Sequence, residues 1–217
     1  AHMTHRLGVV GAEKEEIAQK LRAWRDGRMP ARMTAGQVVG RRKAKIAFVF
    51  TGQGSQYSEM GREIYESEPR FRSAIERCAA IMDSDLGVPL TEVLFGSDSA
   101  TYLADTRYVQ PAIFAVEYAL VDLFRHWGIE PDMVVGHSVG EIVAACVAGV
   151  LDLDDAARFV VARGRLMGQS PQGGRMLSIR GNLRQVQEWI RGRESQVSIA
   201  AVNGPMSVVV SGYAEGV

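Results

Sequence analysis

The sequence predicts an α/β fold, in which a parallel sheet has helices on both faces, followed by the start of a small second subdomain. Residues 46–50 and 133–135 are continuous apolar runs of the kind found in strands that are buried on both faces. Segments with the apolar spacing of helices lie between and after these runs, and alternating strands and helices are typical of a parallel sheet. The 217 residues, 47% of them hydrophobic, are enough for one substantial core.

The region before residue 46 is predicted to be a linker, covering residues 4–45. A short strand-like piece at 7–10 leads into a charged helix whose Ile17, Leu21 and Trp24 share one face. Residues 31–45 are polar and end in a basic run at 41–45. Because no aromatic residue interleaves with these cations, we expect a solvated linker here rather than a nucleic-acid patch.

Residues 46–174 are predicted to form the α/β core. After the first strand, apolar residues recur at helical spacing around 69–83 and 111–127, and Pro111 suits the first turn of the second helix. The second strand is followed by a helix of small and apolar residues at 139–150 and by another that ends near 167. We expect Asp152 to cap this last helix, with Asp155 near its first turn.

A change of pattern near Met176 marks a smaller subdomain, assigned to residues 175–217. Residues 176–179, 197–202 and 207–211 are strand-like, and 183–190 have the pattern of a short helix. This order predicts the opening βαββ of a ferredoxin-like subdomain. Because no closing helix or strand follows, we expect the chain to stop inside this subdomain.

Composition and charge argue against several classes of protein. The 25 basic and 25 acidic residues give a formal net charge of zero, whereas a nucleic-acid binder needs excess cations to neutralise phosphates. No apolar run reaches the roughly 18 residues that a membrane span requires. The two cysteines, Cys78 and Cys146, fit no metal-ligand spacing and are expected to be buried thiols in a reducing compartment. We therefore expect a cytoplasmic protein that binds no metal, nucleic acid or membrane.

The segment Gly136-His137-Ser138-Val139-Gly140 matches the pattern G-x-S-x-G. A buried strand enters it and a helix leaves it, which is the setting of a nucleophile elbow. Small residues are needed on both sides of such a turn, and the turn holds the hydroxyl at the positive end of the following helix. The amide of Val139 would then point at the oxyanion of a tetrahedral intermediate. The alternative is a serine that only caps the helix.

A glycine-rich loop, with the sequence F-T-G-Q-G-S-Q at 50–56, follows the first strand. It is not a dinucleotide-binding loop, because Tyr57 stands where the last glycine of G-x-G-x-x-G is required, and it lacks the G-K-[ST] ending of a P-loop. Its glycines would let the backbone approach a ligand closely, so the amide of Gln53 is a candidate second oxyanion donor. A plain strand-to-helix turn is the alternative.

One arginine lies among apolar residues at helical spacing. Arg163 has Phe159 and Val160 on one side and Leu166 and Met167 on the other. A guanidinium on an apolar face needs an anionic partner, because leaving it unpaired costs several kcal/mol of desolvation. The partner is either a structural carboxylate or the free carboxylate of a bound substrate, held by two hydrogen bonds. The residues alone leave both possibilities open.

Together these residues resemble the malonyl-CoA:acyl carrier protein transacylase family, and more closely the acyltransferase domains of modular (type I) polyketide synthases. The resemblance runs from about residue 46 to the end of the chain and rests on five motifs: Gly52-Gln53-Gly54-Ser55-Gln56, Gln110-Pro111-Ala112, Gly136-His137-Ser138-Val139-Gly140-Glu141, Arg163-Gly164-Arg165-Leu166-Met167 and Ala201-Val202-Asn203-Gly204-Pro205. It implies an α/β-hydrolase-like acyltransferase core. It also makes residues 4–45 the tail of the linker that joins a ketosynthase to such a domain.

The resemblance implies a role for each candidate site residue. Ser138 would be the nucleophile that carries the acyl group, and the amides of Gln53 and Val139 would form the oxyanion hole. Arg163 would hold the carboxylate of the acyl unit, and Gln110 would line the pocket near the serine. The implied reaction moves malonyl from malonyl-CoA to the serine and then to the phosphopantetheine thiol of an acyl carrier protein. No metal or redox cofactor is implied.

Malonyl is expected from two further similarities. Residues 105–110 resemble the malonyl-type signature, except that Val109 stands where Ala or Thr is usual. Val139 after the serine also resembles malonyl-selective members of the family. The neighbouring ketosynthase of the same multienzyme is the other implied partner.

The general base of the family is a histidine well downstream of the serine, and this sequence has no histidine after His137. The elbow is expected to turn His137 away from the nucleophile, and His126 lies among surface-like residues. Removing the base from such a pair costs many orders of magnitude in rate. We therefore expect this fragment to be nearly inactive unless the missing segment is supplied.

Two alternatives to the transferase stay open. A serine hydrolase or thioesterase shares G-x-S-x-G and differs in giving the acyl group to water. Arg163 and the loop at 52–56 argue against it, and no Asp-Gly-Gly follows for a patatin-like dyad. The other alternative is an inactive fragment that lacks the catalytic histidine and acts as a docking piece.

Overall fold

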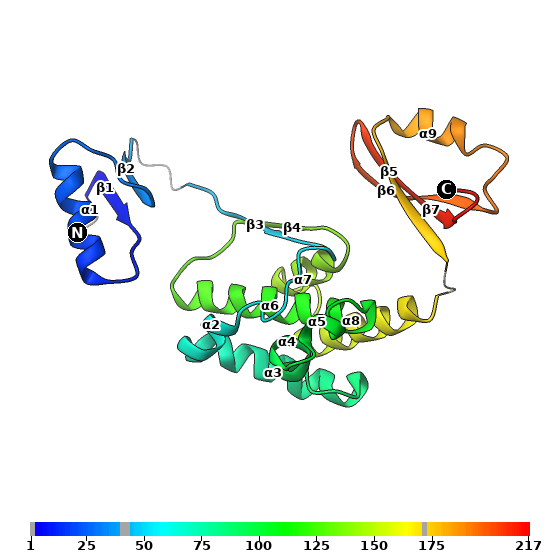
Figure 1. Ribbon diagram of the computed structural model, residues 1–217, viewed down its shortest axis with the longest axis horizontal. Coiled ribbons are helices and arrows are strands. Elements are labelled where there is room, and N and C mark those ends of the chain that lie inside the picture. The colour runs from blue at the N-terminus through cyan, green and yellow to red at the C-terminus, as the bar shows by residue number, and fades with distance from the viewer. Residues whose placement is uncertain (1–2, 40–43, 171–172) are drawn as a thin grey trace. The chain divides into compact units, whose positions relative to one another are not determined.

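The computed structural model describes residues 3–39, 44–170 and 173–217. The chain divides into two compact units, Ala1–Lys45 and Ile46–Val217 (Figure 1).

The first unit is a small β-α-β arrangement. Strand β1 (His5–Val9) leads into helix α1 (Lys14–Arg25), and β1 pairs in antiparallel register with β2 (Met33–Gln37). Strand β2 falls within residues 31–45, which the sequence pattern predicts to be a linker, so part of that segment has regular structure. Its side chains are mostly exposed, so backbone hydrogen bonds hold the strand and no apolar alternation marks it in the sequence. Most of the basic run at 41–45 lies outside the described residues.

The second unit begins with the predicted parallel strands. Strand β3 (Ala47–Phe50) pairs with β4 (Met133–Gly136), and Phe50 lies opposite Gly136. The helices of this unit before the small sheet are α2 (Arg62–Ser67), α3 (Pro69–Leu86), α4 (Leu90–Phe95), α5 (Ser99–Tyr102), α6 (Thr106–His126), α7 (Val139–Val147) and α8 (Leu153–Gly168). The α/β class is confirmed by this arrangement.

The two faces of the β3–β4 sheet differ. Phe48 and Val134 pack against the helical core, whereas Val49 and Val135 on the other face are 72% and 57% exposed. The apolar runs predicted burial on both faces. Within the described residues only one face is covered, because hydrophobic composition indicates what a strand can bury and not what lies against it.

Helix α6 begins earlier than predicted. Its first residue is Thr106, and the carboxylate of Asp105 caps it by accepting a 2.9 Å hydrogen bond from the Arg107 amide. Pro111 therefore lies inside the helix and leaves the carbonyl of Arg107 without its usual intrahelical donor. A side chain at Gly164 would come within 3.0 Å of that carbonyl, so this glycine lets α8 pack closely here.

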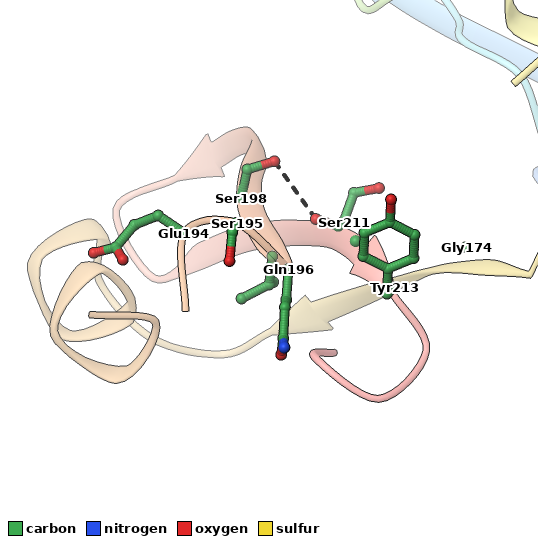
Figure 2. Close-up of a pocket in the computed structure, with 9 residues that line it drawn as sticks. Gly174, Glu194, Ser195, Gln196, Ser198, Ser211 and Tyr213 are labelled. Atoms are coloured by element: carbon green, nitrogen blue, oxygen red, sulfur yellow. Dashed lines mark hydrogen bonds between the residues drawn. The ribbon is translucent and has the colours of Figure 1, made fainter. Parts of the chain in front are cut away.

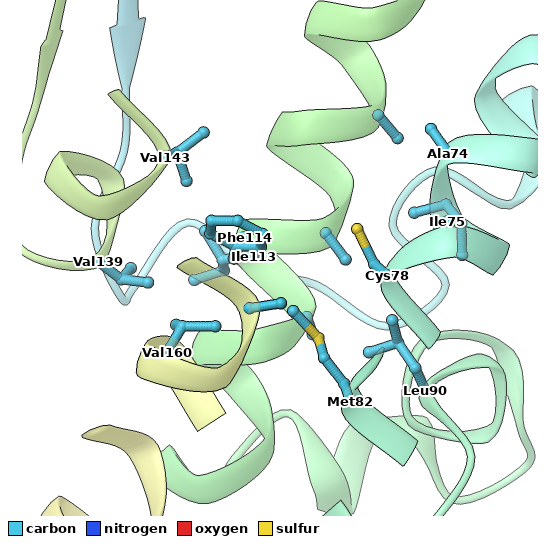
Figure 3. Close-up of a cluster of buried hydrophobic side chains, with 14 of the residues drawn as sticks. Ala74, Ile75, Cys78, Met82, Leu90, Ile113, Phe114, Val139, Val143 and Val160 are labelled. Carbon is cyan, nitrogen blue, oxygen red and sulfur yellow. The ribbon is translucent and has the colours of Figure 1, made fainter. Parts of the chain in front are cut away.

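The core lies between the helices. Side chains from α3, α6, α7 and α8 meet in one cluster, in which Phe71, Ile75, Phe114, Val139 and Val143 are almost completely buried (Figure 3). The cluster holds the first turn of α7 rigidly in place, since close-packed interiors resist displacement. The predicted cap of α8 is confirmed, because the Asp155 amide donates to the Asp152 carboxylate at 2.7 Å.

The two thiols differ in environment. Cys78 is buried in the core as predicted, but Cys146 is only partly buried. Burial raises the pKa of Cys78 to about 12 and that of Cys146 to about 11. No group of three or more potential metal ligands occurs among the described residues.

The predicted βαββ order is confirmed in the last part of the chain. It consists of β5 (Gly174–Ile179), α9 (Leu183–Trp189), β6 (Val197–Gly204) and β7 (Ser207–Tyr213), in an antiparallel sheet of order β5-β7-β6. Helix α9 starts with a capping box between Asn182 and Gln185. Four buried valines, at 186, 197, 208 and 210, form its small core. Within the part of the chain that the structure covers, no helix has the length and apolar character to cross a membrane.

Candidate active site

Ser138 lies at a sharp turn between β4 and α7, in a backbone conformation that few side chains adopt. Its φ is 57° and its ψ is −117°, and such strain costs on the order of 1–3 kcal/mol. The flanking glycines make the turn possible. A Cβ at Gly136 would lie 2.1 Å from the Gly140 carbonyl oxygen, and one at Gly140 would lie 2.5 Å from that of Phe50. This is the strand-turn-helix geometry that the motif predicts.

The hydroxyl of Ser138 does not cap the helix. Its side chain makes no capping hydrogen bond to α7, although it occupies the N-cap position. The residue is exposed, and its Oγ accepts a 3.1 Å hydrogen bond from Nη2 of Arg163. Val139 is the first residue of α7, so the helix itself provides no acceptor for its amide. The site therefore brings together an exposed serine hydroxyl, the first amide of a helix and a cation.

Arg163 extends from α8 toward the serine. Its Nη1 donates to Oε1 of Gln110 while its Nη2 donates to Ser138. Among the described residues, no carboxylate lies within ion-pair distance of this guanidinium. Of its apolar neighbours at helical spacing, Val160 is buried, whereas Phe159 and Leu166 are 54% and 62% exposed, so only part of this apolar face is covered within the described residues.

Gln110 joins Arg163 to the glycine loop. It is completely buried on α6, and its Nε2 donates to Thr106 Oγ1 at 2.9 Å and to Met167 Sδ at 3.2 Å. The hydroxyl of Thr106 in turn donates to Oε1 of Gln53 at 3.0 Å. Sequence reasoning missed Thr106 as part of this network. Its position one helical turn before Gln110 was the available signal.

The glycine loop lies directly against the elbow. A Cβ at Gly52 would lie 2.9 Å from His137 Nδ1 and 3.6 Å from the Ser138 Cβ. Gly52 therefore allows the close approach of backbone that the sequence suggested, and it places the start of the loop beside the serine. Gln53 follows immediately, with its exposed side chain held by Thr106.

Within the second unit, no described histidine side chain forms a hydrogen bond with the Ser138 hydroxyl. His137 is exposed, and its Nε2 lies 3.1 Å from Oδ1 of Asn203 in β6. His126 is the last residue of α6 and is also exposed. The expectation that neither histidine reaches Ser138 agrees with these contacts. The contact of Asn203 was not predicted, although that residue lies in one of the quoted motifs.

A separate hollow lies on the small sheet. Its volume is about 280 Å³, and its lining includes Glu194, Gln196 and Tyr213 (Figure 2). Between two of its lining residues, the Ser198 hydroxyl donates a 3.5 Å hydrogen bond to the Ser211 carbonyl (Figure 2). None of the predicted site residues lines this hollow, so it is not the candidate active site.

Comparison with known proteins identifies the family of the chain. The family model described as "Acyl transferase domain" matches residues 47–217. The polyketide synthase Pks15/1 of Mycobacterium marinum is 46% identical over 210 residues, which are 96% of this chain and 10% of that protein.

Two solved structures extend the comparison. The acyltransferase domain from the second module of the salinomycin polyketide synthase is 41% identical with a TM-score of 0.87, covering 97% of this chain and 49% of that one. The acyltransferase domain of SpnD is 33% identical with a TM-score of 0.79, covering 98% and 48%. The chain thus spans about half the length of these solved domains and a small part of the curated relative. By the family match and these likenesses, the chain belongs to the acyltransferase domain family of polyketide synthases.

Proposed function

We propose that this chain is the nucleophile-bearing part of an acyltransferase that moves malonyl from coenzyme A to an acyl carrier protein. The observation that carries the proposal is the 3.1 Å contact between Arg163 Nη2 and Ser138 Oγ. A malonyl thioester has a carboxylate two bonds from its reacting carbonyl carbon. A guanidinium beside the nucleophile is placed to hold that carboxylate by paired hydrogen bonds while the carbonyl meets the hydroxyl.

The first half-reaction acylates the serine. Ser138 Oγ attacks the thioester carbon and gives its proton to a general base, and the negative charge on the tetrahedral intermediate is stabilised by the amides of Val139 and Gln53. The intermediate collapses with cleavage of the C–S bond, and coenzyme A leaves as a thiol after receiving the proton. In the second half-reaction the phosphopantetheine thiol of the carrier protein attacks the malonyl-serine ester in the same manner.

We propose that the general base is a histidine, as the family resemblance implies, and that it is none of the histidines of this sequence. His137 is engaged with Asn203, and the other described histidines make no contact with Ser138. The family places its base downstream of the serine, and the solved domains are about twice as long as this chain. We therefore expect the described residues to bind substrate and orient the serine, and the added half to supply proton transfer.

The choice of acyl group rests on the pocket residues. Gln110 fixes Arg163, which favours acyl groups that carry a carboxylate over simple acetyl groups. The related domain of SpnD was solved in complex with 2-(pent-4-yn-1-yl)malonyl, which is also a carboxylated acyl group. Val139 and residues 105–110 favour unsubstituted malonyl. We further propose that residues 4–45 link this domain to a neighbouring ketosynthase.

The experiment uses the chain completed to the length of the solved domains and incubated with malonyl-CoA. Intact-protein and peptide mass spectrometry should find one malonyl group on Ser138, and Ser138→Ala should abolish it. Transfer should follow when a carrier protein is added. Rapid release of free malonate without transfer would instead identify a hydrolase.

A second variant tests whether Arg163 binds the carboxylate of the acyl group. Arg163→Ala should reduce malonyl loading by at least about 100-fold, because removing one partner of a charge-assisted pair costs several kcal/mol. Acetyl loading should persist or rise. Equal losses for malonyl and acetyl would show that Arg163 is structural and would contradict its assignment to the carboxylate.

A further inference from the structure

A partly buried acid on α6 faces the loop that precedes the predicted oxyanion donor. Glu117 lies seven residues after Gln110, two helical turns farther along the same face of the helix. Its Oε1 accepts two hydrogen bonds from Thr51, one from the amide and one from the hydroxyl, each 2.7 Å long. Thr51 is the first residue after β3 and directly precedes Gly52-Gln53.

The environment of this carboxyl group is unfavourable to its charge. A groove of about 220 Å³ beside it is lined mainly by apolar side chains, among them Phe48, Leu120 and Phe124. Burial raises the pKa of Glu117, although the two hydrogen bonds from Thr51 oppose the shift. Its Oε2 is buried and has no hydrogen-bond partner among the described residues. A buried carboxylate oxygen without a partner costs free energy of folding, so stability alone does not explain an acid at this position.

The contacts of Glu117 restrain the flexible end of the loop. Gly52 alone separates Thr51 from Gln53, and a glycine gives little resistance to rotation of the backbone. The far side of Gln53 is held by its side-chain bond to Thr106. Two hydrogen bonds to a carboxylate hold Thr51, and one neutral hydrogen bond from Thr106 holds the side chain of Gln53. The peptide between them therefore has a defined orientation beside Ser138.

We propose that Glu117 is a positioning residue for the acyl-transfer reaction, which holds the amide of Gln53 toward Ser138 through Thr51. The proposal rests on the proposed role of that amide in the oxyanion hole. An oxyanion donor acts only when it is fixed before the charge develops, and losing one donor costs about 100- to 1,000-fold in kcat. Loosening the donor should therefore lower kcat and leave the binding of malonyl-CoA unchanged.

The kinetic test uses the completed domain and three variants. Glu117→Ala removes the acceptor and should lower kcat by about 10- to 100-fold with KM within about twofold of the parent value. Glu117→Gln keeps an oxygen that accepts both bonds from Thr51 and should restore kcat to within about threefold. Glu63→Ala, at an exposed position in α2, is the matched control and should have no effect.

A spectroscopic test covers the case in which Glu117→Ala fails to fold. In the chain itself, the Thr51 amide proton should shift with the ionisation of Glu117 and report a pKa above the ordinary value, because the amide donates to that carboxylate. Glu117→Gln should abolish this titration. Thr51→Val, which keeps the amide but loses the hydroxyl, should give an intermediate loss of kcat.

The outcomes separate the inference from the proposed function. If Ser138→Ala does not abolish malonyl loading, the proposed function fails and this inference fails with it. If loading on Ser138 is normal, three results overturn the inference alone. These are a rise in KM with unchanged kcat in Glu117→Ala, no rescue by Glu117→Gln, or a Thr51 amide that does not titrate.

Discussion

The helical core that carries Ser138 and the small sheet that carries Asn203 are stabilised very differently. Around the elbow, side chains from four helices meet in one large buried cluster, and Phe114 and Val139 are completely buried. In the small sheet, the buried cluster consists of four valines among the described residues. A hydrogen bond between Asn203 and His137 joins a side chain of this sheet to the elbow. The difference indicates that the nucleophile depends on the helical core for its position. The small sheet contributes chiefly through side chains at its surface.

The first test of this comparison truncates one buried side chain in the helical core and one in the small sheet. Phe114→Ala should destabilise the protein by about 4 kcal/mol, because it leaves a large cavity among fixed helices. Val208→Ala removes two methyl groups from the small sheet and should cost only about 1–2 kcal/mol. Chemical denaturation followed by tryptophan fluorescence measures both. Equal losses would contradict the picture of one dominant core.

A second test adds a single methyl group at the turn. Gly140→Ala would place a Cβ 2.5 Å from the carbonyl oxygens of both Phe50 and Thr51, so the strand and the helix must separate. We expect a loss of about 3 kcal/mol in stability and no acylation of Ser138. Gly204→Ala, where nothing lies within 4 Å of the added Cβ, is the matched control in the small sheet. A Gly140→Ala protein of parental stability would contradict the close packing of loop and elbow.

The two cysteines differ in how deeply they lie in the helical core, because Cys78 is buried and Cys146 is only partly buried. Both pKa values lie above the ordinary value of 9, at about 12 for Cys78 and about 11 for Cys146. Because the folded state favours the neutral thiols, the stability they contribute is present below pH 9 and is lost as pH rises through 9 toward these values. Iodoacetamide should modify Cys146 at least about tenfold faster than Cys78 at pH 8, since its thiolate is more populated and more accessible. Peptide mass spectrometry over time measures both rates.

The smallest expected effect concerns the contact between the two regions. Asn203→Ala removes one exposed hydrogen bond to His137 and should change the free energy of unfolding by less than about 1 kcal/mol. The imidazole resonances of His137 should nevertheless shift, because its Nε2 loses its partner. Unchanged resonances would show that the contact is absent in solution.

Local motifs predicted the parts of the site that depend on neighbours in sequence. Gly136 to Gly140 indicated the elbow, because its geometry follows from glycines at fixed spacing between a strand and a helix. Asp152 indicated the start of α8 for a similar reason. In contrast, Pro111 predicts a later start for α6 than Thr106, because the proline pattern takes no account of the Asp105 carboxylate that caps the helix.

Contacts between distant segments were not predictable from one sequence. Glu117 meets Thr51 from 66 positions away, and nothing in the spacing of apolar residues around α6 distinguishes that acid from a solvated one. The contacts of Thr106 with Gln53 and of Asn203 with His137 also join segments that are far apart in the sequence. Strand β2 was missed because its side chains are exposed and it is held by backbone pairing to β1.

The hydrogen bond from Arg163 to Ser138 has a consequence for the resting protein. While Nη2 donates to the hydroxyl oxygen, one lone pair of that oxygen is occupied and its electron density is drawn away from an approaching carbonyl. If Arg163 holds the carboxylate of the acyl group, as proposed, that carboxylate competes for the same N–H and releases the oxygen as it binds. On that proposal, a thioester without a carboxylate leaves the hydroxyl hydrogen-bonded, and the residue that selects the acyl group also restrains the serine until that group binds.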